Sequence, residues 1–120
     1  MDDIYREIIL DHYKNPRNFG KLDAPSGSFS LYNSACGDKI EIEIEVKSEI
    51  VKDIKFRGEG CAISMASASL LTENVIGKSI EEIKKMERKD ILKLLGTELT
   101  PSRLKCALLP LEVLHKALDK

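Results

Sequence analysis

Four side chains of this sequence could bind one metal. The chain contains three cysteines, Cys36, Cys61 and Cys106, and Asp38 stands two residues after the first of them. Three thiolates and one carboxylate make four ligands, which is the number that tetrahedral zinc takes, and thiolates also hold iron–sulfur clusters. The residue types therefore predict a metal site made of these four side chains, and they leave the metal open.

The surroundings of each cysteine bear on this hypothesis. Cys36 lies in the run NSACGD, whose glycine and polar residues indicate a turn rather than a packed core. Cys61 is expected at the start of a helix, and the positive end of a helix favours a thiolate. The charge of Lys105 does the same for Cys106. However, Cys106 also lies on an apolar helix, where a cysteine is as often a small packing residue. The residues alone do not place it beside the others.

Three predicted strands must position the first part of this site. Residues 40–47 (IEIEIEVK) alternate between apolar and acidic side chains, as in a strand that is buried on one face. After a loop over residues 21–28, residues 29–34 are expected to form a short strand before it. Residues 51–57 are expected to form its hairpin partner across a turn near Glu49.

The side chains of this hairpin also predict its register. The pairs expected from the turn are Glu43–Lys55, Ile42–Phe56, Glu41–Arg57 and, less favourably, Glu45–Asp53. Continued outward, the same register places Asp38 opposite Gly60. Two residues further out, Cys36 falls opposite Ala62. Both predicted ligands would then meet Cys61 at the open end of the hairpin.

Helices are predicted before and after the strands. Apolar residues at helical spacing indicate a helix over residues 2–14, which the run NPRNFG ends. Later helices are expected over residues 61–76, from the capping box at 79–82, over 87–95, and after Thr100 with Pro101 at the first helical position. This order favours an α+β fold, with a small three-stranded antiparallel sheet and helices packed on one face, in a single domain spanning residues 1–120.

Neither histidine is a good ligand candidate. His12 follows an acidic residue on the first helix and is predicted to lie on the helix surface. His115 lies on the same predicted helix as Cys106 but about 180° around it, so the two side chains cannot share one site on a straight helix.

Composition and charge narrow the classes of function. The net charge of −1 provides no overall positive field for nucleic acid. No apolar run approaches the roughly 20 residues that a membrane span needs, and the N-terminal run MDDIYREIILDHY lacks the pattern of a signal peptide. Three cysteines without a CxxC pair or an export signal indicate reduced thiols, so a cytoplasmic protein is expected. From the charge and the lack of a long apolar run, no nucleic-acid or membrane partner is expected.

The sequence resembles the IscU/NifU/SufU family of iron–sulfur cluster assembly proteins. The resemblance extends nearly end to end, through YREIILDHYKNPRNFG, ACGD, GEGCAISMASASLLTE and SRLKCALLPLEVL. It implies a three-stranded antiparallel sheet packed against helices. It also implies that the three cysteines meet at one exposed end, which places Cys106 beside Cys36 and Cys61, with Asp38 sharing the site.

The resemblance implies a function in sulfur and iron handling. A scaffold of this family accepts sulfur from a cysteine desulfurase, builds a labile [2Fe–2S] cluster on the four ligands and transfers it to acceptor proteins, with a possible homodimer when loaded. Such a protein is a carrier more than a true enzyme. The alternative is a SufU-type sulfurtransferase with zinc in the same site, which accepts persulfide from a desulfurase. A structural zinc domain without a role in sulfur transfer is the least favoured of the three functions.

Features of two branches of the family occur together in this chain. IscU-type scaffolds carry a histidine where Lys105 stands, and an LPPVK motif where residues 99–103 read LTPSR. SufU-type proteins carry RxKCA, which residues 103–107 match, but they also carry an insertion between the second and third cysteines that is absent here. The persulfide acceptor is accordingly expected to be Cys106 in a scaffold, beside the supporting Lys105, or Cys36 in a sulfurtransferase.

Overall fold

The computed structural model describes residues 3–33, 37–97 and 99–119 of the chain. One helix, α1 (Asp3–Lys14), precedes three strands, and four helices follow them. The strands are β1 (Gly27–Asn33), β2 (Asp38–Lys47) and β3 (Ile50–Glu59). The later helices are α2 (Ala62–Val75), α3 (Ile80–Lys84), α4 (Arg88–Leu95) and α5 (Pro101–Leu118).

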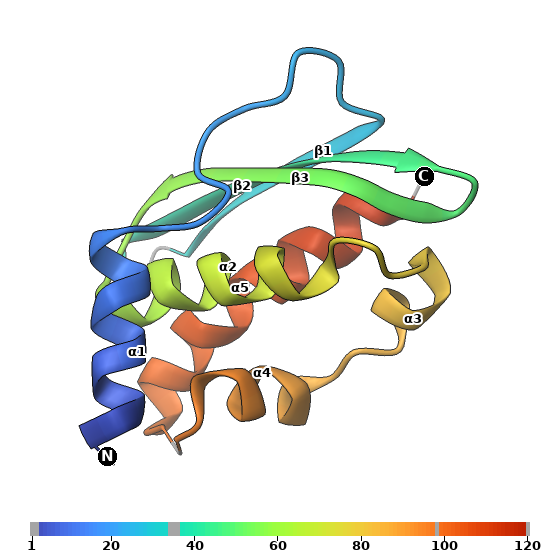
Figure 1. Ribbon diagram of the computed structural model, residues 1–120. Coiled ribbons are helices and arrows are strands. Elements are labelled where there is room, and N and C mark those ends of the chain that lie inside the picture. Colours follow the sequence, from blue (N-terminus) through green and yellow to red (C-terminus); the bar gives the residue numbers. More distant parts are fainter. Residues whose placement is uncertain (1–2, 34–36, 98, 120) are drawn as a thin grey trace.

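The three strands form one antiparallel sheet in the order β1-β2-β3, with helices packed on one of its faces, which confirms the predicted α+β fold (Figure 1). Helix α5 packs against β1 and β2, and α2 packs against β3. Helices α1 and α4 pack against α2 in turn. The close packing of α5 on β1 depends on Gly27, because a Cβ there would lie 2.6 Å from the carbonyl oxygen of Ala117.

The alternation of β2 decides which face of the sheet is buried. Six apolar side chains of β2 and β3 in the core are 2% exposed or less, and they are Ile40, Ile42, Ile44, Val51, Ile54 and Phe56. On the other face, Arg57 forms salt bridges with Glu41 at 2.9 Å and with Glu43 at 3.2 Å. The segment between α1 and β1 first runs along the edge of β3, where the amide of Phe56 donates to the carbonyl of Asn18. It then crosses to the face of the sheet that the helices leave uncovered (Figure 1).

The predicted register of the β2–β3 hairpin is confirmed over most of its length. Glu41 pairs with Arg57, Glu43 with Lys55, and the other two expected pairs also form. The turn differs from the prediction, because a bulge between Glu45 and Val46 shifts the last pairs by one residue. Ser48 and Glu49 then form a two-residue turn with φ values of 54° and 65°. Such left-handed turns usually carry Gly or Asn, so these two residues gave no signal for it.

The helix boundaries follow their predicted signals closely. Ser79 and Glu82 form the capping box that opens α3, and α4 ends at Gly96 in the left-handed conformation, with φ of 72°. Thr100 occupies the N-cap position of α5 but makes no side-chain capping bond. Strand β1 starts at Gly27, inside the segment predicted as loop, because residues 27 and 28 continue the pairing with β2.

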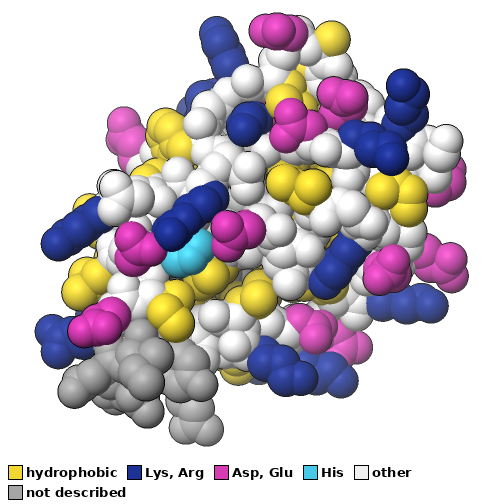
Figure 2. Space-filling view, viewed as in Figure 1, with side chains coloured by type: hydrophobic (Ala, Val, Ile, Leu, Met, Phe, Trp, Pro, Cys, Tyr) yellow, Lys and Arg dark blue, Asp and Glu magenta, His cyan; other side chains and the backbone are white. Residues whose placement is uncertain are grey.

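The surface seen in Figure 2 carries both signs of charge side by side, and neither sign forms a continuous patch over this face. Among the described residues, no helix is long and apolar enough to cross a membrane.

The prediction that His12 lies on the helix surface is wrong. His12 is 7% exposed, and its Nδ1 lies 2.7 Å from Oγ of Ser69 on α2. The Ser69 oxygen accepts the backbone amide of Arg17 at 2.8 Å, so the serine proton is available to His12. Positions 9 and 12 share one face of a helix, and that face packs on α2, with Ile9 also buried. The acidic neighbour at position 11 did not indicate this contact.

The stability of the protein should therefore depend on the protonation of His12. Burial lowers the pKa of His12 from its ordinary value and the charge of Arg17 adds to this effect, whereas Glu73 and Asp11 oppose it. Because the folded state favours the neutral ring, this contribution is complete above the unfolded pKa of about 6.5 and is lost as the pH falls from there through the lowered folded pKa.

We expect the free energy of urea unfolding to fall more steeply between about pH 7.5 and pH 5.5 in the native chain than in His12→Gln, because glutamine cannot titrate. The variant keeps every other titrating group, so it controls for their contributions. Equal slopes in the two proteins would contradict a buried neutral histidine.

Candidate metal centre

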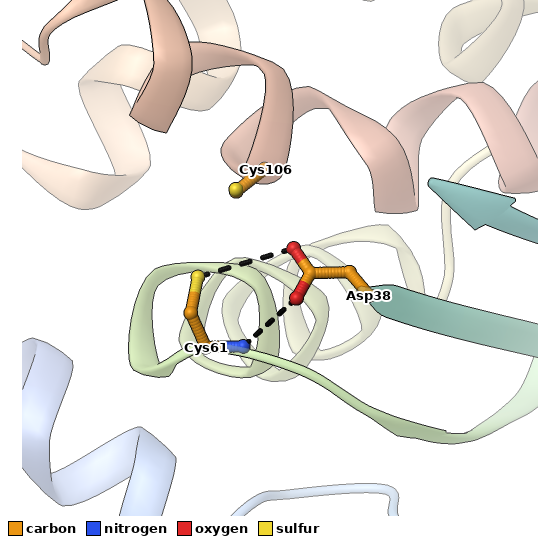
Figure 3. Close-up of side chains that lie close together, drawn as sticks. All are labelled: Asp38, Cys61 and Cys106. Carbon is orange, nitrogen blue, oxygen red and sulfur yellow. Dashed lines mark hydrogen bonds between the residues drawn. The ribbon is translucent and has the colours of Figure 1, made fainter. Parts of the chain in front are cut away.

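Three possible ligands from distant parts of the chain meet at one end of the sheet. Asp38 begins β2, Cys61 precedes α2, and Cys106 lies in the second turn of α5. One ligand atom from each lies within 4.8 Å of the other two, and the three side chains point toward one another (Figure 3). Both cysteines are free thiols. The structure thus places Cys106 next to the other two side chains, a position that the residue pattern alone could not predict.

Asp38 is positioned by the strand pairing that the sequence predicted. It pairs with Asn33 of β1, and its neighbour Lys39 pairs with Glu59 of β3, so the next step outward faces Gly60. The carboxylate is fully buried, and a buried carboxylate needs polar partners. Its Oδ1 accepts the backbone amide of Cys61 at 2.9 Å, and its Oδ2 lies 3.9 Å from the Cys61 sulfur, which donates to it.

Gly60 makes this approach of the carboxylate possible. A Cβ at position 60 would lie 2.6 Å from Oδ1 of Asp38 and 2.9 Å from its Cγ. A Cβ atom essentially never makes contacts this short, so only glycine leaves the carboxylate where it is.

Cys61 is the N-cap residue of α2, as the sequence predicted. Its backbone is extended, and its sulfur accepts the amide of Ser64 at 3.5 Å. The sulfur thus faces the free amides of the first helical turn, where negative charge is favoured. Cys61 is partly exposed, so this corner of the site is open to solvent.

Cys106 approaches from the opposite helix. It is 5% exposed, and its thiol donates to the carbonyl of Ser102 one turn back at 3.6 Å. Helices α2 and α5 are held together beside it, because Oγ of Ser67 donates to the carbonyl of Ala107 at 2.6 Å.

The two other predicted site residues, Cys36 and Lys105, are not part of this group of three side chains. Cys36 lies outside the described residues, and its nearest described neighbours are Asn33 and Gly37. Lys105 is exposed on α5 and lines a groove of about 410 Å³ between α5 and the end of β1, with Leu31, Tyr32 and Leu108 among its walls. Its part in the chemistry remains a prediction.

The histidines lie elsewhere. His12 faces Ser69, and Nε2 of His115 lies 2.9 Å from the carbonyl oxygen of Ile83 in α3. Neither belongs to the group of Asp38, Cys61 and Cys106.

The donor set fits a thiophilic metal. Two thiols and one buried carboxylate match the ligand types of zinc sites, and thiolates match those of iron–sulfur clusters. Ser64, whose backbone amide donates to the Cys61 sulfur, has a buried Oγ with no hydrogen-bond partner among the described residues. Sequence reasoning missed Ser64, although its position three residues after Cys61 places it in the same helical turn.

Several known proteins are similar in sequence to this chain. The sequence profile of the NifU-like N terminal domain matches residues 4–120. The zinc-dependent sulfurtransferase SufU of Bacillus subtilis (strain 168) is 40% identical over 137 residues, covering 100% of this chain and 92% of that protein. The iron-sulfur cluster assembly scaffold protein IscU of Escherichia coli (strain K12) is 38% identical over 118 residues, covering 95% and 91%.

A solved structure has the same arrangement of elements. The crystal structure of FiSufU from the thermophile Fervidobacterium islandicum AW-1 superposes with a TM-score of 0.83 at 29% sequence identity, covering 93% of this chain and 94% of that one. The sheet and the helices that hold the three side chains are therefore shared with a relative of known structure.

Proposed function

This chain belongs to the family of NifU-like N-terminal domains, and from that premise we propose that it is a scaffold for iron–sulfur cluster assembly. Residues 1–120 act as one domain that receives sulfur and iron, holds a [2Fe–2S] cluster as cargo and releases it to acceptor proteins. The observation that carries this proposal is the convergence of Asp38, Cys61 and Cys106 within 4.8 Å.

The four proposed ligands are Cys36, Asp38, Cys61 and Cys106. A carboxylate is a harder ligand than a thiolate and binds an iron–sulfur cluster less strongly, so a mixed set favours release of the cargo. The Cys61 amide fixes the orientation of Asp38 through the 2.9 Å hydrogen bond. The partly exposed Cys61 leaves the site accessible to a partner protein.

The proposed partners follow from the chemistry of loading and release. Sulfur must come from a protein that carries it as a persulfide, which is the product of a cysteine desulfurase, and the cargo must leave to proteins that need a cluster. The proposal includes a homodimer of loaded chains.

A second candidate function is supported by one relative and one motif. The Bacillus subtilis relative is named a zinc-dependent sulfurtransferase, and residues 103–107 carry the RxKCA pattern. In this alternative the same four side chains would hold zinc as a resident ion, and Cys36 would leave it to accept persulfide. Both functions use the same site, so identifying the cysteine that accepts the persulfide distinguishes one function from the other.

The experiment maps the persulfide. The acceptor thiolate attacks the outer sulfur of the desulfurase persulfide, a new sulfur–sulfur bond forms, and the desulfurase thiolate leaves. We incubate the apo and zinc forms with desulfurase and cysteine, without iron, and identify the modified residue by mass spectrometry. Cys106→Ser and Cys36→Ser serve as matched variants that each remove one acceptor.

For a scaffold we expect the persulfide on Cys106, loss of labelling in Cys106→Ser only, and a [2Fe–2S] absorption spectrum once iron and reductant are added. Persulfide confined to Cys36, with zinc required and no cluster formed, would overturn the scaffold in favour of sulfur transfer.

A further inference from the structure

The outer edge of β1 has no partner strand in the described part of the chain. The sheet order is β1-β2-β3, and the isolated bridges outside the strands fall on β3. Natural edge strands are usually protected by charged side chains, by proline or by a bulge. Strand β1 reads GSFSLYN, with no charged residue and no proline. Its edge is therefore a template on which another strand can pair.

The opposite edge of the sheet is covered by the chain itself. Phe56 of β3 donates its amide to the carbonyl of Asn18 and accepts the amide of Gly20. Val51 of the same strand is bonded in the same way to residues 77 and 78. Among the described residues, the fold thus protects the β3 edge and leaves the β1 edge open.

Helix α5 runs antiparallel to β1 along this open edge. Its C-terminal end lies at the start of the strand, where a Cβ on Gly27 would lie 2.6 Å from the carbonyl oxygen of Ala117. Nζ of Lys116 lies 5.7 Å from the centre of the Phe29 ring. The N-terminal half of the helix lies at the other end of the strand, where Lys105 lines the groove of about 410 Å³.

This groove is apolar in the middle and charged at its two ends. Leu31 and Leu108, both partly exposed, lie in the middle. Lys105 is exposed one turn before Leu108 and Glu112 one turn after it, so the two charges share one face of the helix. Neither forms a salt bridge with another described residue. A fitting partner brings an apolar side chain to the middle, a carboxylate to Lys105 and a cation to Glu112.

The rise along the two elements places Leu31 level with Leu108. From the contact between Gly27 and Ala117, the step from Gly27 to Leu31 covers about 13 Å of strand. The step from Ala117 back to Leu108 also covers about 13 Å of helix. The two leucines therefore lie side by side, and both line the groove.

A second copy of this chain meets these requirements. With a twofold axis perpendicular to the sheet at Leu31, β1 pairs antiparallel with β1 of the copy, and the same residues of both chains make the contact. The two Leu31 side chains then meet in the middle of the groove. Because Lys105 and Glu112 lie on either side of Leu108, the axis brings Lys105 of each copy toward Glu112 of the other.

The position of α5 beneath the sheet also fits a second copy. The helix packs against both β1 and β2, so its axis lies about midway between them. Adjacent strands are about 4.8 Å apart, so joining two sheets through β1 would place the two α5 helices about 10 Å apart. Helices pack at about this distance, so strand pairing and helix packing can form together.

We propose that the open edge of β1 is the interface of a homodimer, in which the two sheets join through β1 and α5 packs on α5 of the other copy. This inference does not rest on the proposed function, because the contact needs neither metal nor cluster. Asp38 pairs with Asn33, two residues beyond the axis, and lies on the next strand. The two candidate metal sites are therefore about 20 Å apart, and each copy keeps its own.

The test exchanges the two charges that face each other across the axis. Sedimentation velocity of the apo protein under reductant gives the dissociation constant of the dimer. Lys105→Glu and Glu112→Lys each turn two attractive contacts into repulsive ones, so each should weaken the dimer by about 10-fold or more. The double variant again has opposite charges across the axis and should dimerise about as well as the native chain.

Lys52→Glu is the matched control for the change in net charge. Lys52 is exposed on β3, at the opposite edge of the sheet, so its reversal should leave the dimer unchanged. Hydrogen exchange adds a readout of the strand pairing itself. Amide exchange in β1 should slow as the protein concentration rises, because the edge amides gain partners, whereas exchange in β3 should not change.

Weaker dimers in both single variants, with recovery in the double variant and slower exchange in β1, support the proposal. A native chain that stays monomeric up to about 1 mM overturns it. A dimer that either reversal leaves intact, that the double variant does not restore, or that forms without slower exchange in β1 also overturns it. All of these outcomes leave the scaffold proposal standing, because persulfide mapping tests that proposal separately.

Discussion

Replacing Asp38 by alanine should weaken zinc binding by about 100-fold or more and should lengthen the life of a bound [2Fe–2S] cluster. Loss of a supporting partner alone costs about 10–100-fold in metal affinity, so loss of a ligand should cost at least as much. For the cluster the carboxylate is the hard and labile ligand among softer thiolates. Removing it should slow transfer to an acceptor protein, which is followed by the decay of visible absorption.

The matched control for this experiment is Asp38→Asn. An amide oxygen can still accept the Cys61 amide, which the Asp38 Oδ1 does at 2.9 Å, but it brings no negative charge to the metal. We therefore expect Asp38→Asn to keep the unfolding midpoint of the native apo protein and still lose zinc affinity. Alanine also leaves the Cys61 amide without its acceptor, which costs about 1–3 kcal/mol if the group stays buried. Equal cluster lifetimes in the native chain and both variants would count against Asp38 as a ligand.

Replacing Gly60 by alanine should damage the site while sparing the fold. The added Cβ would lie 2.6 Å from Oδ1 of Asp38, so the carboxylate must move away from the Cys61 amide. We expect zinc affinity to fall by about 10–100-fold, as for other losses of ligand orientation. The free energy of urea unfolding of the apo protein should change by less than the free energy of zinc binding, because only the Asp38 side chain has to move.

Gly58→Ala provides the contrast, because the same substitution two residues earlier meets backbone. Its Cβ would lie only 2.0 Å from the carbonyl oxygen of Lys39, and β2 and β3 must separate locally to admit it. Forced backbone shifts of this kind cost about 1–3 kcal/mol, occasionally more, so we expect a large loss in unfolding free energy. If Gly60→Ala destabilised the apo protein as much as Gly58→Ala, the role of Gly60 would be general packing rather than placement of the carboxylate.

The sequence by itself determined the sheet and half of the site. The alternation of apolar and acidic residues over 40–47 predicts which side chains face the core, since successive side chains of a strand point to opposite faces. Charge pairing with residues 51–57 then set the register, and the register carried Asp38 to Gly60 and Cys61. Helix starts and stops followed from local signals, because capping residues act within one turn of the helix end they satisfy.

Only the tertiary structure decided what depends on packing between distant elements. Cys106 reaches Asp38 and Cys61 because α5 and α2 pack side by side on the sheet, and no local pattern around Cys106 encodes that neighbour. The burial of His12 and the unpaired hydroxyl of Ser64 were missed for the same reason. Local patterns fix the conformation of a segment, whereas the surroundings of a side chain are set by the many weak contacts that hold whole elements together.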